Sequence, residues 1–256
     1  MTQDLAGRHA LVTGGGRGIG AAIARGLAER GAQVTLLART AAQLADTAAA
    51  LPGKPGTVVA DVTDAQQVER AFAEARRRAG EIHILVNNAG KAASRALAKC
   101  DEDFWQQILA VNLSATYHCT RAALPAMLAA NWGRIVNVSS TAGLRGYAYC
   151  TAYCAAKHGV VGMTRALALE VAKTGITVNA VCPGYTDTGV VRDAVANISA
   201  KTGRSEAVAR ETLVSSNPQQ RLVRPDEVAN AVIWLCLPGS ESINGQSIAI
   251  AGGEVT

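Results

Sequence analysis

Aromatic residues are scarce in this chain, and its positive charge is not concentrated. Only 4% of the 256 residues are aromatic, and only two are phenylalanine. The net charge is +5 at pH 7, yet no run of five basic residues occurs, and the densest group is Arg76-Arg77-Arg78. These arginines end a predicted helix, where cations complement the helix dipole. A nucleic-acid surface needs clustered basic residues interleaved with aromatic ones, so nucleic acid is not an expected partner.

The six cysteines form no pattern typical of a metal site or a disulfide framework. They stand at positions 100, 119, 150, 154, 182 and 236, without a CxxC pair or a Cys–His cluster at metal-ligand spacing. The N-terminus lacks the apolar core of a signal peptide, and no uninterrupted apolar run of 18 residues occurs. We therefore expect a reduced, soluble, cytoplasmic protein with no metal site and no membrane partner.

Short apolar runs and helical patterns alternate along the whole sequence. Hydrophobic residues make up 49% of the chain and charged residues 18%, which is compatible with a sizeable core. The alternation predicts an α/β fold with a single doubly wound, parallel, seven-stranded sheet and helices on both faces. The predicted strands cover 9–13, 33–39, 57–60, 82–87, 133–140, 176–182 and 247–251, and the predicted helices after the first cover about 40–50, 63–79, 101–130, 151–173 and 225–237.

One domain over residues 1–256 is expected, because the chain has no linker, internal repeat or low-complexity tract. Residues 185–224 are the longest stretch without a predicted strand, and they are polar and partly helical. Long connections of this kind inside a compact domain are usually functional. We expect a substrate-binding lid there.

A glycine-rich loop follows the first predicted strand directly. Residues Gly14-Gly-Gly-Arg17-Gly18-Ile19-Gly20 join that strand to a helical pattern that continues through Arg30. Glycines let such a turn close and let backbone N–H groups at the helix N-terminus approach a pyrophosphate. The spacing G-x-x-x-G-x-G differs from the usual fingerprint G-x-G-x-x-G, but the strand–loop–helix context predicts a dinucleotide site.

The residues after the second predicted strand indicate which dinucleotide is bound. In NAD-binding folds an acidic residue near this point holds the ribose 2′-OH. Ala38 and Arg39 occupy the region here. Arginine can bind a 2′-phosphate with two hydrogen bonds, and Arg17 in the glycine loop could converge on the same group. The sequence therefore favours NADP(H), with NAD(H) as the alternative.

Polar and small residues follow several other predicted strands. Asp61 could accept a hydrogen bond from an adenine amino group, and Asn88-Ala89-Gly90 could brace strands and pass backbone close to a ligand. Asn112 lies inside a predicted helix, where asparagine is unfavourable, so it indicates a specific role or a local distortion. Ser140 and Pro183-Gly184 follow two further strands. Ligands of open parallel sheets bind outside the carboxyl ends of the strands, so these residues predict one common site.

Tyr153 and Lys157 join Ser140 in a candidate reaction centre. The tyrosine and the lysine are four residues apart, so they share one face of a predicted helix. An ammonium beside a phenol favours the phenolate, so we expect the pKa of Tyr153 to lie below its usual value of about 10. Such a tyrosine is a candidate general acid/base for an alcohol or carbonyl, and the Ser140 hydroxyl could hold the reacting oxygen.

In these motifs the chain resembles the short-chain dehydrogenase/reductase family over essentially its whole length. The matching residues are Thr13-Gly-x-x-x-Gly-x-Gly20, Asp61-Val62, Asn87-Asn88-Ala89-Gly90, Asn112, Ser140, Tyr153-x-x-x-Lys157 and Pro183-Gly184. The resemblance implies a Rossmann fold that binds NAD(P) and a catalytic tetrad of Asn112, Ser140, Tyr153 and Lys157. The cofactor contacts that it implies are Gly14, Arg17, Gly18, Ile19, Gly20, Arg39, Asp61, Val62, Asn88, Ala89, Gly90, Tyr153, Lys157, Pro183, Gly184, Thr186 and Thr188.

The resemblance also implies a mechanism. Ser140 and Tyr153 hold the substrate oxygen while the nicotinamide delivers hydride, and Tyr153 supplies the proton. Lys157 binds the nicotinamide ribose and stabilises the phenolate, and Asn112 positions a water that links Lys157 to solvent. The hydride chemistry belongs to the cofactor, and the protein contributes orientation and electrostatics.

Within the family, residues 153–170 and 174–184 look like those of β-ketoacyl reductases and polyketide-type ketoreductases. This implies an NADPH-dependent reductase of a 3-oxoacyl thioester or a similar small ketone. Members that act on carrier-bound substrates have basic residues at two positions that here are Asn131 and Thr174, so a CoA thioester or free ketone is expected instead. The alternatives are an NAD-dependent dehydrogenase of secondary alcohols and a non-catalytic dinucleotide sensor, although sensors usually lack the tyrosine or the lysine.

The lining of the substrate site is expected from residues 91–97, 141–150 and 185–215. Tyr147 and Tyr185, together with Tyr149, are its predicted aromatic walls beside Ser140 and Tyr153. Arg95, Arg145 and Arg192 either meet an acidic group of the substrate or stay solvated. Tetramers of the family pair helices such as 101–130 and 151–173 and pair the last strand across another axis, so we expect a homotetramer.

Overall fold

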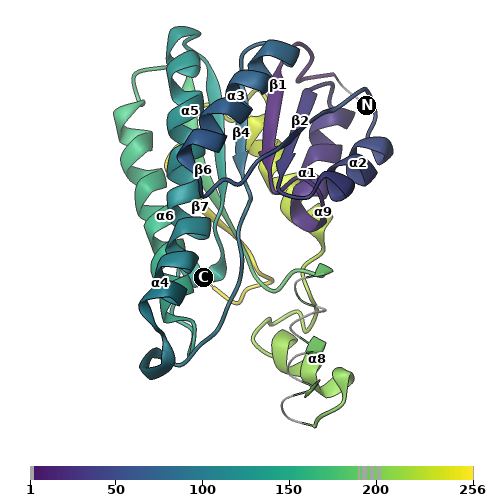
Figure 1. Cartoon of the computed structure of the whole chain (residues 1–256), viewed down its shortest axis with the longest axis vertical. Coiled ribbons are helices and arrows are strands. Elements are labelled where there is room, and N and C mark those ends of the chain that lie inside the picture. Colours follow the sequence, from purple (N-terminus) through teal and green to yellow (C-terminus); the bar gives the residue numbers. More distant parts are fainter. Residues whose placement is uncertain (1–2, 190, 192–194, 197–198, 201–202, 256) are drawn as a thin grey trace.

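Seven parallel strands form the centre of the molecule. The computed structural model describes residues 3–189, 191, 195–196, 199–200 and 203–255 (Figure 1). The order of the sheet is β3-β2-β1-β4-β5-β6-β7, and every neighbouring pair is parallel. The strands are β1 (His9–Thr13), β2 (Gln33–Ala38), β3 (Gly56–Val59), β4 (Ile84–Asn87), β5 (Gly133–Val138), β6 (Ile176–Pro183) and β7 (Ser247–Ile250). The predicted doubly wound α/β sheet is confirmed.

The sheet separates two apolar cores, because successive residues of a strand point to opposite faces. Val12 and Val86 belong to one core, whereas their neighbours Leu11 and Leu85 belong to the other. The helices on the first face are α1 (Gly18–Glu29), α2 (Ala41–Ala50) and α9 (Pro225–Cys236), and those on the second are α3 (Ala65–Ala79), α5 (Ala115–Ala129) and α6 (Thr151–Glu170) (Figure 1). Both faces are covered, which is why the strands are apolar throughout rather than alternating.

The helical region predicted as one element at 101–130 is divided in the structure. It consists of α4 (Glu102–Leu109), a π-helical segment η2 (Ala110–Ser114) and α5. Asn112 lies in η2, and its side-chain amide donates to the carbonyl of Ile108 over 3.0 Å. The local distortion predicted from this asparagine is therefore present, and the expectation of one continuous helix was wrong. Two shorter 3₁₀ turns, η1 (Leu97–Lys99) and η3 (Thr141–Gly143), lie in the connections.

Residues 185–224 leave the sheet and return to it at neighbouring points. Thr186 pairs with Val223 in an isolated parallel bridge, and Asp187 N donates to the carbonyl of Val223 over 2.8 Å. Between these points, α8 (Glu206–Val214) belongs to a lobe below the main body (Figure 1). Ala209 and Leu213 of α8 pack in a small apolar cluster of this segment. The segment joins the sheet at the carboxyl end of β6, and its role as a lid stays a prediction.

Candidate active site

The glycine-rich loop and the end of β4 are bound together where the strand order reverses between β1 and β4. The side-chain amide of Asn88 donates to the carbonyls of Thr13 and Gly14 over 2.9 and 3.2 Å. In return, the Thr13 hydroxyl accepts from the backbone N–H groups of Asn88 and Ala89, both at 3.0 Å. Ligands of doubly wound sheets bind at such a switch point. The bracing role predicted for Asn88 is confirmed.

The glycine loop is too tight for side chains at two positions. Gly14 has φ of +65°, a conformation that L-residues rarely adopt. A Cβ atom on Gly20 would lie 2.3 Å from the carbonyl oxygen of Gly14. The loop leads into α1, whose N-cap Arg17 is exposed and whose first turn contains no acidic residue. The residues present therefore fit the pyrophosphate of a dinucleotide, which takes backbone N–H groups at a helix N-terminus.

Arg39 lies at the end of β2, across from Asp61 at the end of β3. Its nearest guanidinium nitrogen is 3.7 Å from the Asp61 carboxylate, and the Arg39 side chain is 74% exposed. A long, exposed ion pair contributes little to stability, so the guanidinium is accessible to a phosphate. The Asp61 carboxylate also accepts from the backbone N–H and the hydroxyl of Thr63. The predicted convergence of Arg17 on the same phosphate stays a prediction.

Lys157 is buried behind the end of β4, with only 4% of its surface exposed. Its ammonium donates to the carbonyl of Val138 at the end of β5 over 2.9 Å. A Cβ on Gly90 would lie 3.6 Å from this ammonium and 2.9 Å from the Asn112 side-chain oxygen. The side chains of Lys157 and Asn112 therefore both approach the backbone at Gly90. Burial lowers the pKa of Lys157 to about 8.

Asn112 fastens the loop that follows β4 to the π-helical segment η2. Its side-chain oxygen accepts from the backbone N–H of Lys91 over 3.1 Å, and its amide donates to the carbonyl of Lys91 over 3.0 Å. The asparagine is buried. Its side chain is therefore part of the connection between Gly90, Lys157 and the helices α4 and α5.

Ser140 and Tyr153 face each other across the start of α6. The Ser140 hydroxyl accepts from the N–H of Ala142 over 3.1 Å and lies close enough to the Tyr153 hydroxyl to influence its pKa. The ammonium of Lys157 lies 5.8 Å from the centre of the Tyr153 ring. Burial raises the pKa of Tyr153 to about 12, although the Ser140 hydroxyl opposes the shift. The expected lowering of this pKa was wrong for the protein alone, because loss of hydration at the phenol is the largest influence on the pKa.

The tyrosines of the predicted substrate walls have different surroundings. Tyr149 and Tyr185 are exposed, and Tyr149 has φ of +65° while its carbonyl accepts from the N–H of Arg95. Tyr147 is half-buried, and its hydroxyl lies 2.8 Å from the Thr141 hydroxyl and 2.5 Å from a carboxylate oxygen of Glu254. Burial, followed by the bond to Glu254, raises the pKa of Tyr147.

Glu254 is the one residue of this region that sequence patterns missed. It lies at the C-terminal end of the described chain, yet its carboxylate reaches the loop after β5 and the glycine after β6. Nothing in the sequence near Glu254 signals these contacts, because they join positions far apart along the chain, such as Tyr147 and Glu254. Only the turn-forming Gly252-Gly253 before it indicated that the chain reverses there.

The arginines predicted for the substrate mouth are mostly engaged. Arg95 forms an ion pair with Asp101 over 2.9 Å and stacks on Phe104. Arg145 lies over the ring of Tyr147 and donates to the backbone carbonyl of Glu254 over 3.4 Å. Arg192 lies outside the described residues. An anion at the mouth would therefore have to compete with existing partners.

The remaining predicted cofactor residues lie along the same edge of the sheet. Thr186 is buried, and its hydroxyl donates to the carbonyl of Gly184 over 3.0 Å. The methyl group of Thr188 is close to Gly18, since a Cβ on this glycine would lie 3.2 Å away. The segment after β6 thus lies over the glycine loop. Ile19 and Val62 lie beside this edge as predicted from their motifs, at the start of α1 and after β3.

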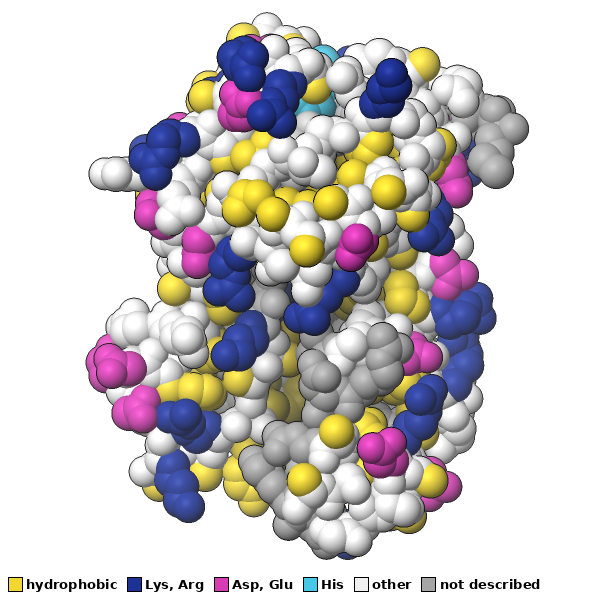
Figure 2. Space-filling model, turned by 45° about the vertical axis from the view of Figure 1, so that its right-hand side comes forward, with side chains coloured by type: hydrophobic (Ala, Val, Ile, Leu, Met, Phe, Trp, Pro, Cys, Tyr) yellow, Lys and Arg dark blue, Asp and Glu magenta, His cyan; other side chains and the backbone are white. Residues whose placement is uncertain are grey.

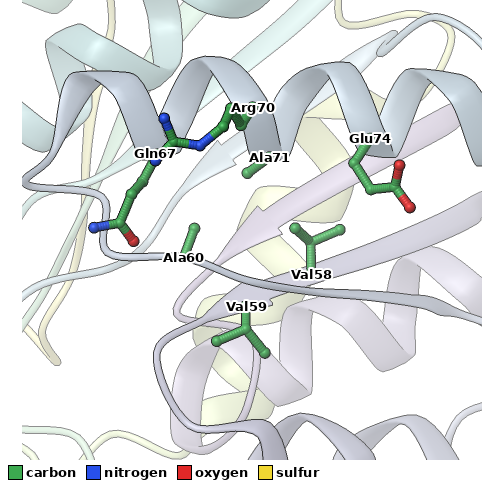
Figure 3. A pocket seen from close by; sticks show the side chains of 7 residues that line it. All are labelled: Val58, Val59, Ala60, Gln67, Arg70, Ala71 and Glu74. Atoms are coloured by element: carbon green, nitrogen blue, oxygen red, sulfur yellow. The ribbon is translucent and has the colours of Figure 1, made fainter.

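The surface around this edge is hollowed. Figure 2 shows a depression between the main body and the lobe that contains α8, with Lys and Arg side chains on its rim. Two other hollows contain none of the predicted site residues. One of about 330 Å³ lies between β3 and α3 and is lined by Val58, Val59, Ala60, Gln67, Arg70, Ala71 and Glu74 (Figure 3). The other, of about 620 Å³, lies between α1 and α9.

The described residues contain neither a metal-binding cluster nor a membrane-spanning helix. Among the described residues, no three or more His, Cys, Asp and Glu side chains are grouped so that they could hold a metal ion. No helix in the described part of the chain is both long enough and apolar enough to cross a membrane.

Comparison with known proteins gives consistent matches over the whole chain. Residues 8–199 match the family model described as short chain dehydrogenase. The chain is 38% identical to D-beta-hydroxybutyrate dehydrogenase of Cupriavidus necator, with 98% of this chain and 99% of that protein covered. It is 37% identical to 3-oxoacyl-[acyl-carrier-protein] reductase of Vibrio harveyi, with 98% of each covered. Among solved structures, a variant of actinorhodin polyketide ketoreductase with NADPH matches with a TM-score of 0.93 and 37% identity, covering 99% of this chain and 98% of that one.

Proposed function

Because the chain belongs to the short-chain dehydrogenase family, we propose that it is an NADPH-dependent reductase of ketones, with 3-oxoacyl thioesters as its substrate class. The observation that carries the proposal is the grouping of the predicted catalytic residues where β4 and β5 end and α6 begins. There, Lys157 and Asn112 both approach the backbone at Gly90, where a Cβ would lie 3.6 and 2.9 Å from their polar atoms, and Ser140 is close enough to Tyr153 to influence its pKa. Relatives described as ketoreductases and as 3-oxoacyl reductases support the same chemistry.

NADPH, when bound, supplies hydride to the carbonyl carbon. The glycine loop and the N-terminus of α1 offer backbone N–H groups to its pyrophosphate, and the exposed Arg39 offers a guanidinium to its 2′-phosphate. Lys157 is proposed to bind the nicotinamide ribose, and Thr186, Thr188 and Pro183-Gly184 complete the same edge.

Ser140 and Tyr153 are proposed to hold the substrate oxygen with their hydroxyl groups. At neutral pH Tyr153 is a neutral phenol, since its pKa is raised to about 12, and this is the form that can donate a proton to a carbonyl oxygen. Lys157 would stabilise the phenolate left behind. Its own pKa of about 8 allows it to pass a proton near neutral pH, with Asn112 positioning the water that connects it to solvent.

A CoA thioester or a free ketone is the proposed substrate rather than a carrier-bound one. The family resemblance implies that carrier-dependent members have basic residues at two positions, which here are Asn131 and Thr174. The two positions lie close together, since the Asn131 side-chain oxygen accepts from the N–H of Gly175 over 3.0 Å. Neither has a charge for an acidic carrier protein, although the exposed Lys173 is adjacent. Comparing kcat/KM for acetoacetyl-CoA and acetoacetyl carrier protein tests this choice.

Turnover is tested by following NADPH absorbance with acetoacetyl-CoA and a panel of ketones. We expect Tyr153→Phe to lower kcat by on the order of 10²–10⁴-fold, because the proton donor is lost, while NADPH still binds with the affinity of the parent chain. Cofactor fluorescence measures that binding. Substantial activity in the Phe variant would refute the role of Tyr153.

The second candidate is an NAD-linked dehydrogenase of secondary alcohols, which the similarity to D-beta-hydroxybutyrate dehydrogenase favours. The two candidates differ in the cofactor and in the direction of the reaction. A strong preference for NADH in kcat/KM, unchanged in Arg39→Ala, would favour the dehydrogenase. A preference for NADPH that Arg39→Ala abolishes would favour the reductase.

A further inference from the structure

The chain reverses after β7 and carries Glu254 back to the candidate active site. Glu254 N donates to the carbonyl of Ala251 over 3.1 Å, and Gly252 and Gly253 have φ of +61° and +93°. A Cβ on Gly252 would lie 2.2 Å from the side-chain oxygen of Asn217, so glycine is required there. The result is that a carboxylate oxygen of Glu254 lies 3.0 Å from where a Cβ of Gly184 would be.

A chain of hydrogen bonds fixes this carboxylate beside the reaction centre. The Tyr147 hydroxyl is 2.5 Å from Glu254 Oε1 and 2.8 Å from Thr141 Oγ1. A carboxylate only accepts and the phenol has one proton, so Tyr147 donates to Glu254 and Thr141 donates to Tyr147. Thr141 is buried and directly follows Ser140. Two hydrogen bonds, one on each side of Tyr147, therefore connect the Glu254 carboxylate to Thr141, the residue that follows Ser140.

Arg145 and Lys157 form no ion pair with the Glu254 carboxylate. Arg145 is exposed and reaches the backbone carbonyl of Glu254 rather than its side chain. Lys157 is buried and donates to the carbonyl of Val138. Within the described parts of the chain, no ion pair with Glu254 is found. Tyr185, which also lies near this group, is uncharged at neutral pH, as a tyrosine with its ordinary pKa of about 10 is.

We infer that Glu254 is a specificity-determining residue that disfavours substrates with a negative charge next to the reacting ketone. The inference rests on the proposed function, since it requires a ketone at Ser140 and Tyr153. The 3-oxoacyl part of a thioester is neutral, whereas a free 3-oxo acid carries a carboxylate two carbons from the ketone. Repulsion between two like charges across a partly buried site is expected to disfavour binding on the order of 10-fold. Glu254 thereby selects thioesters, amides and simple ketones over free 3-oxo acids.

The test compares two small substrates of nearly equal shape, acetoacetate and its neutral amide. We expect Glu254→Gln, whose amide oxygen can still accept from Tyr147, to raise the ratio of kcat/KM for acetoacetate over acetoacetamide roughly 10-fold. KM for NADPH should not change. Glu81→Gln is the matched control, because it removes the same charge at the opposite edge of the sheet, about 20 Å away along β4. It should leave the ratio unchanged.

The salt dependence of the unmodified chain gives a second readout that does not depend on a folded variant. The ratio of kcat/KM for acetoacetate over acetoacetamide should rise as ionic strength rises, since salt screens the repulsion. Dissociation constants of the two compounds, measured by NMR titration, should show the same ratio without any turnover. The two proposals are thus tested separately. An unchanged ratio with intact NADPH-dependent turnover would refute only the role of Glu254, whereas a lack of turnover would refute the proposed function. A ratio that is unchanged in Glu254→Gln and insensitive to salt would overturn the inference, as would an equal effect on both compounds.

Discussion

At the scale of the residue, the site combines a phenol that resists ionisation with a lysine that titrates near neutral pH. Burial raises the pKa of Tyr153 to about 12 and lowers that of Lys157 to about 8. Both shifts have the same cause, because burial penalises whichever form is charged. The tyrosine is thereby kept as a proton donor, and the lysine becomes the group whose charge changes over the physiological range.

Lys157 predicts a pH dependence of cofactor use. Below pH 8 the lysine of the free protein is charged and can attract the cofactor, and above pH 8 it becomes neutral. We expect kcat/KM for NADPH to fall with rising pH through an apparent pKa near 8, since this parameter reports the free enzyme. A pH series with a saturating neutral ketone measures it.

The control for this prediction is Lys157→Met, which removes the titrating group. Its weaker binding of NADPH, followed by fluorescence, should lack the inflection near pH 8. A profile of the unmodified chain that is flat from about pH 7 to 9.5 would show that Lys157 does not control cofactor binding.

Spacing in the sequence placed Tyr153 and Lys157 on one helix, but it could not give their ionisation. The i,i+4 relation is local, and α6 forms as predicted around both residues. Desolvation depends on what covers the side chains, which comes from β4, β5 and the loop at Gly90. Glu254 was missed for a related reason, because its partners Tyr147 and Gly184 are close in space and distant along the chain.

At the scale of the element, the segment η2 connects the helices to the site. Asn112 satisfies the backbone N–H and carbonyl of Lys91 while it donates to Ile108 within the helix. π-Helical segments often occur at functional sites, and here the distortion allows one side chain to reach the end of β4. A regular helix over 101–130 would keep the Ile108 carbonyl for its own N–H donor.

Asn112→Ala tests this connection. We expect a loss of about 1–3 kcal/mol in the free energy of unfolding, because the substitution removes the hydrogen bonds of a buried amide to Lys91 and Ile108. Denaturant titration measures the loss, and faster exchange of the Lys91 amide proton should accompany it. Ser114→Ala in the same segment is the control and should change stability by less than about 0.5 kcal/mol. Equal effects of the two substitutions would contradict the role given to Asn112.

Most strands were predictable because each is a short apolar run that ends in a glycine or polar residue. β1 and β2 begin where expected, whereas β4 begins at Ile84, two residues later than predicted, and β5 ends at Val138 instead of 140. Ser139 N still donates to the carbonyl of Val181, so the chain leaves the ladder gradually. Such ends depend on neighbouring strands, which sequence patterns do not contain.

At the scale of the whole molecule, apolar side chains are exposed on the outer helices. Tyr117 and Leu128 of α5 are exposed, and Leu169 of α6 is 80% exposed. Trp234 of α9 is exposed on the other side of the sheet. Tyr117, Leu128 and Leu169 lie on the helices that the expected homotetramer would pair, and apolar side chains are often exposed where proteins associate. The homotetramer through helices 101–130 and 151–173, with a second axis at the last strand, stays a prediction.

The proposed homotetramer predicts a sedimentation mass of four times the 26.4 kDa of the chain. Leu169→Glu would bury an unpaired charge at one of the two proposed axes. The free energy lost on burying that charge is expected to exceed the free energy gained when the two helices pair. We therefore expect dimers from this variant in analytical ultracentrifugation, held by the remaining axis. Val208→Glu on α8 is the matched control, since Val208 is also exposed but lies in the lobe outside both proposed axes.

Turnover should change together with the assembly, because α6 carries Tyr153 and Lys157 near its start and Leu169 near its end. Loss of one axis should therefore lower turnover, whereas Val208→Glu should keep it. A monomeric parent chain, or tetramers of Leu169→Glu, would refute pairing through α6.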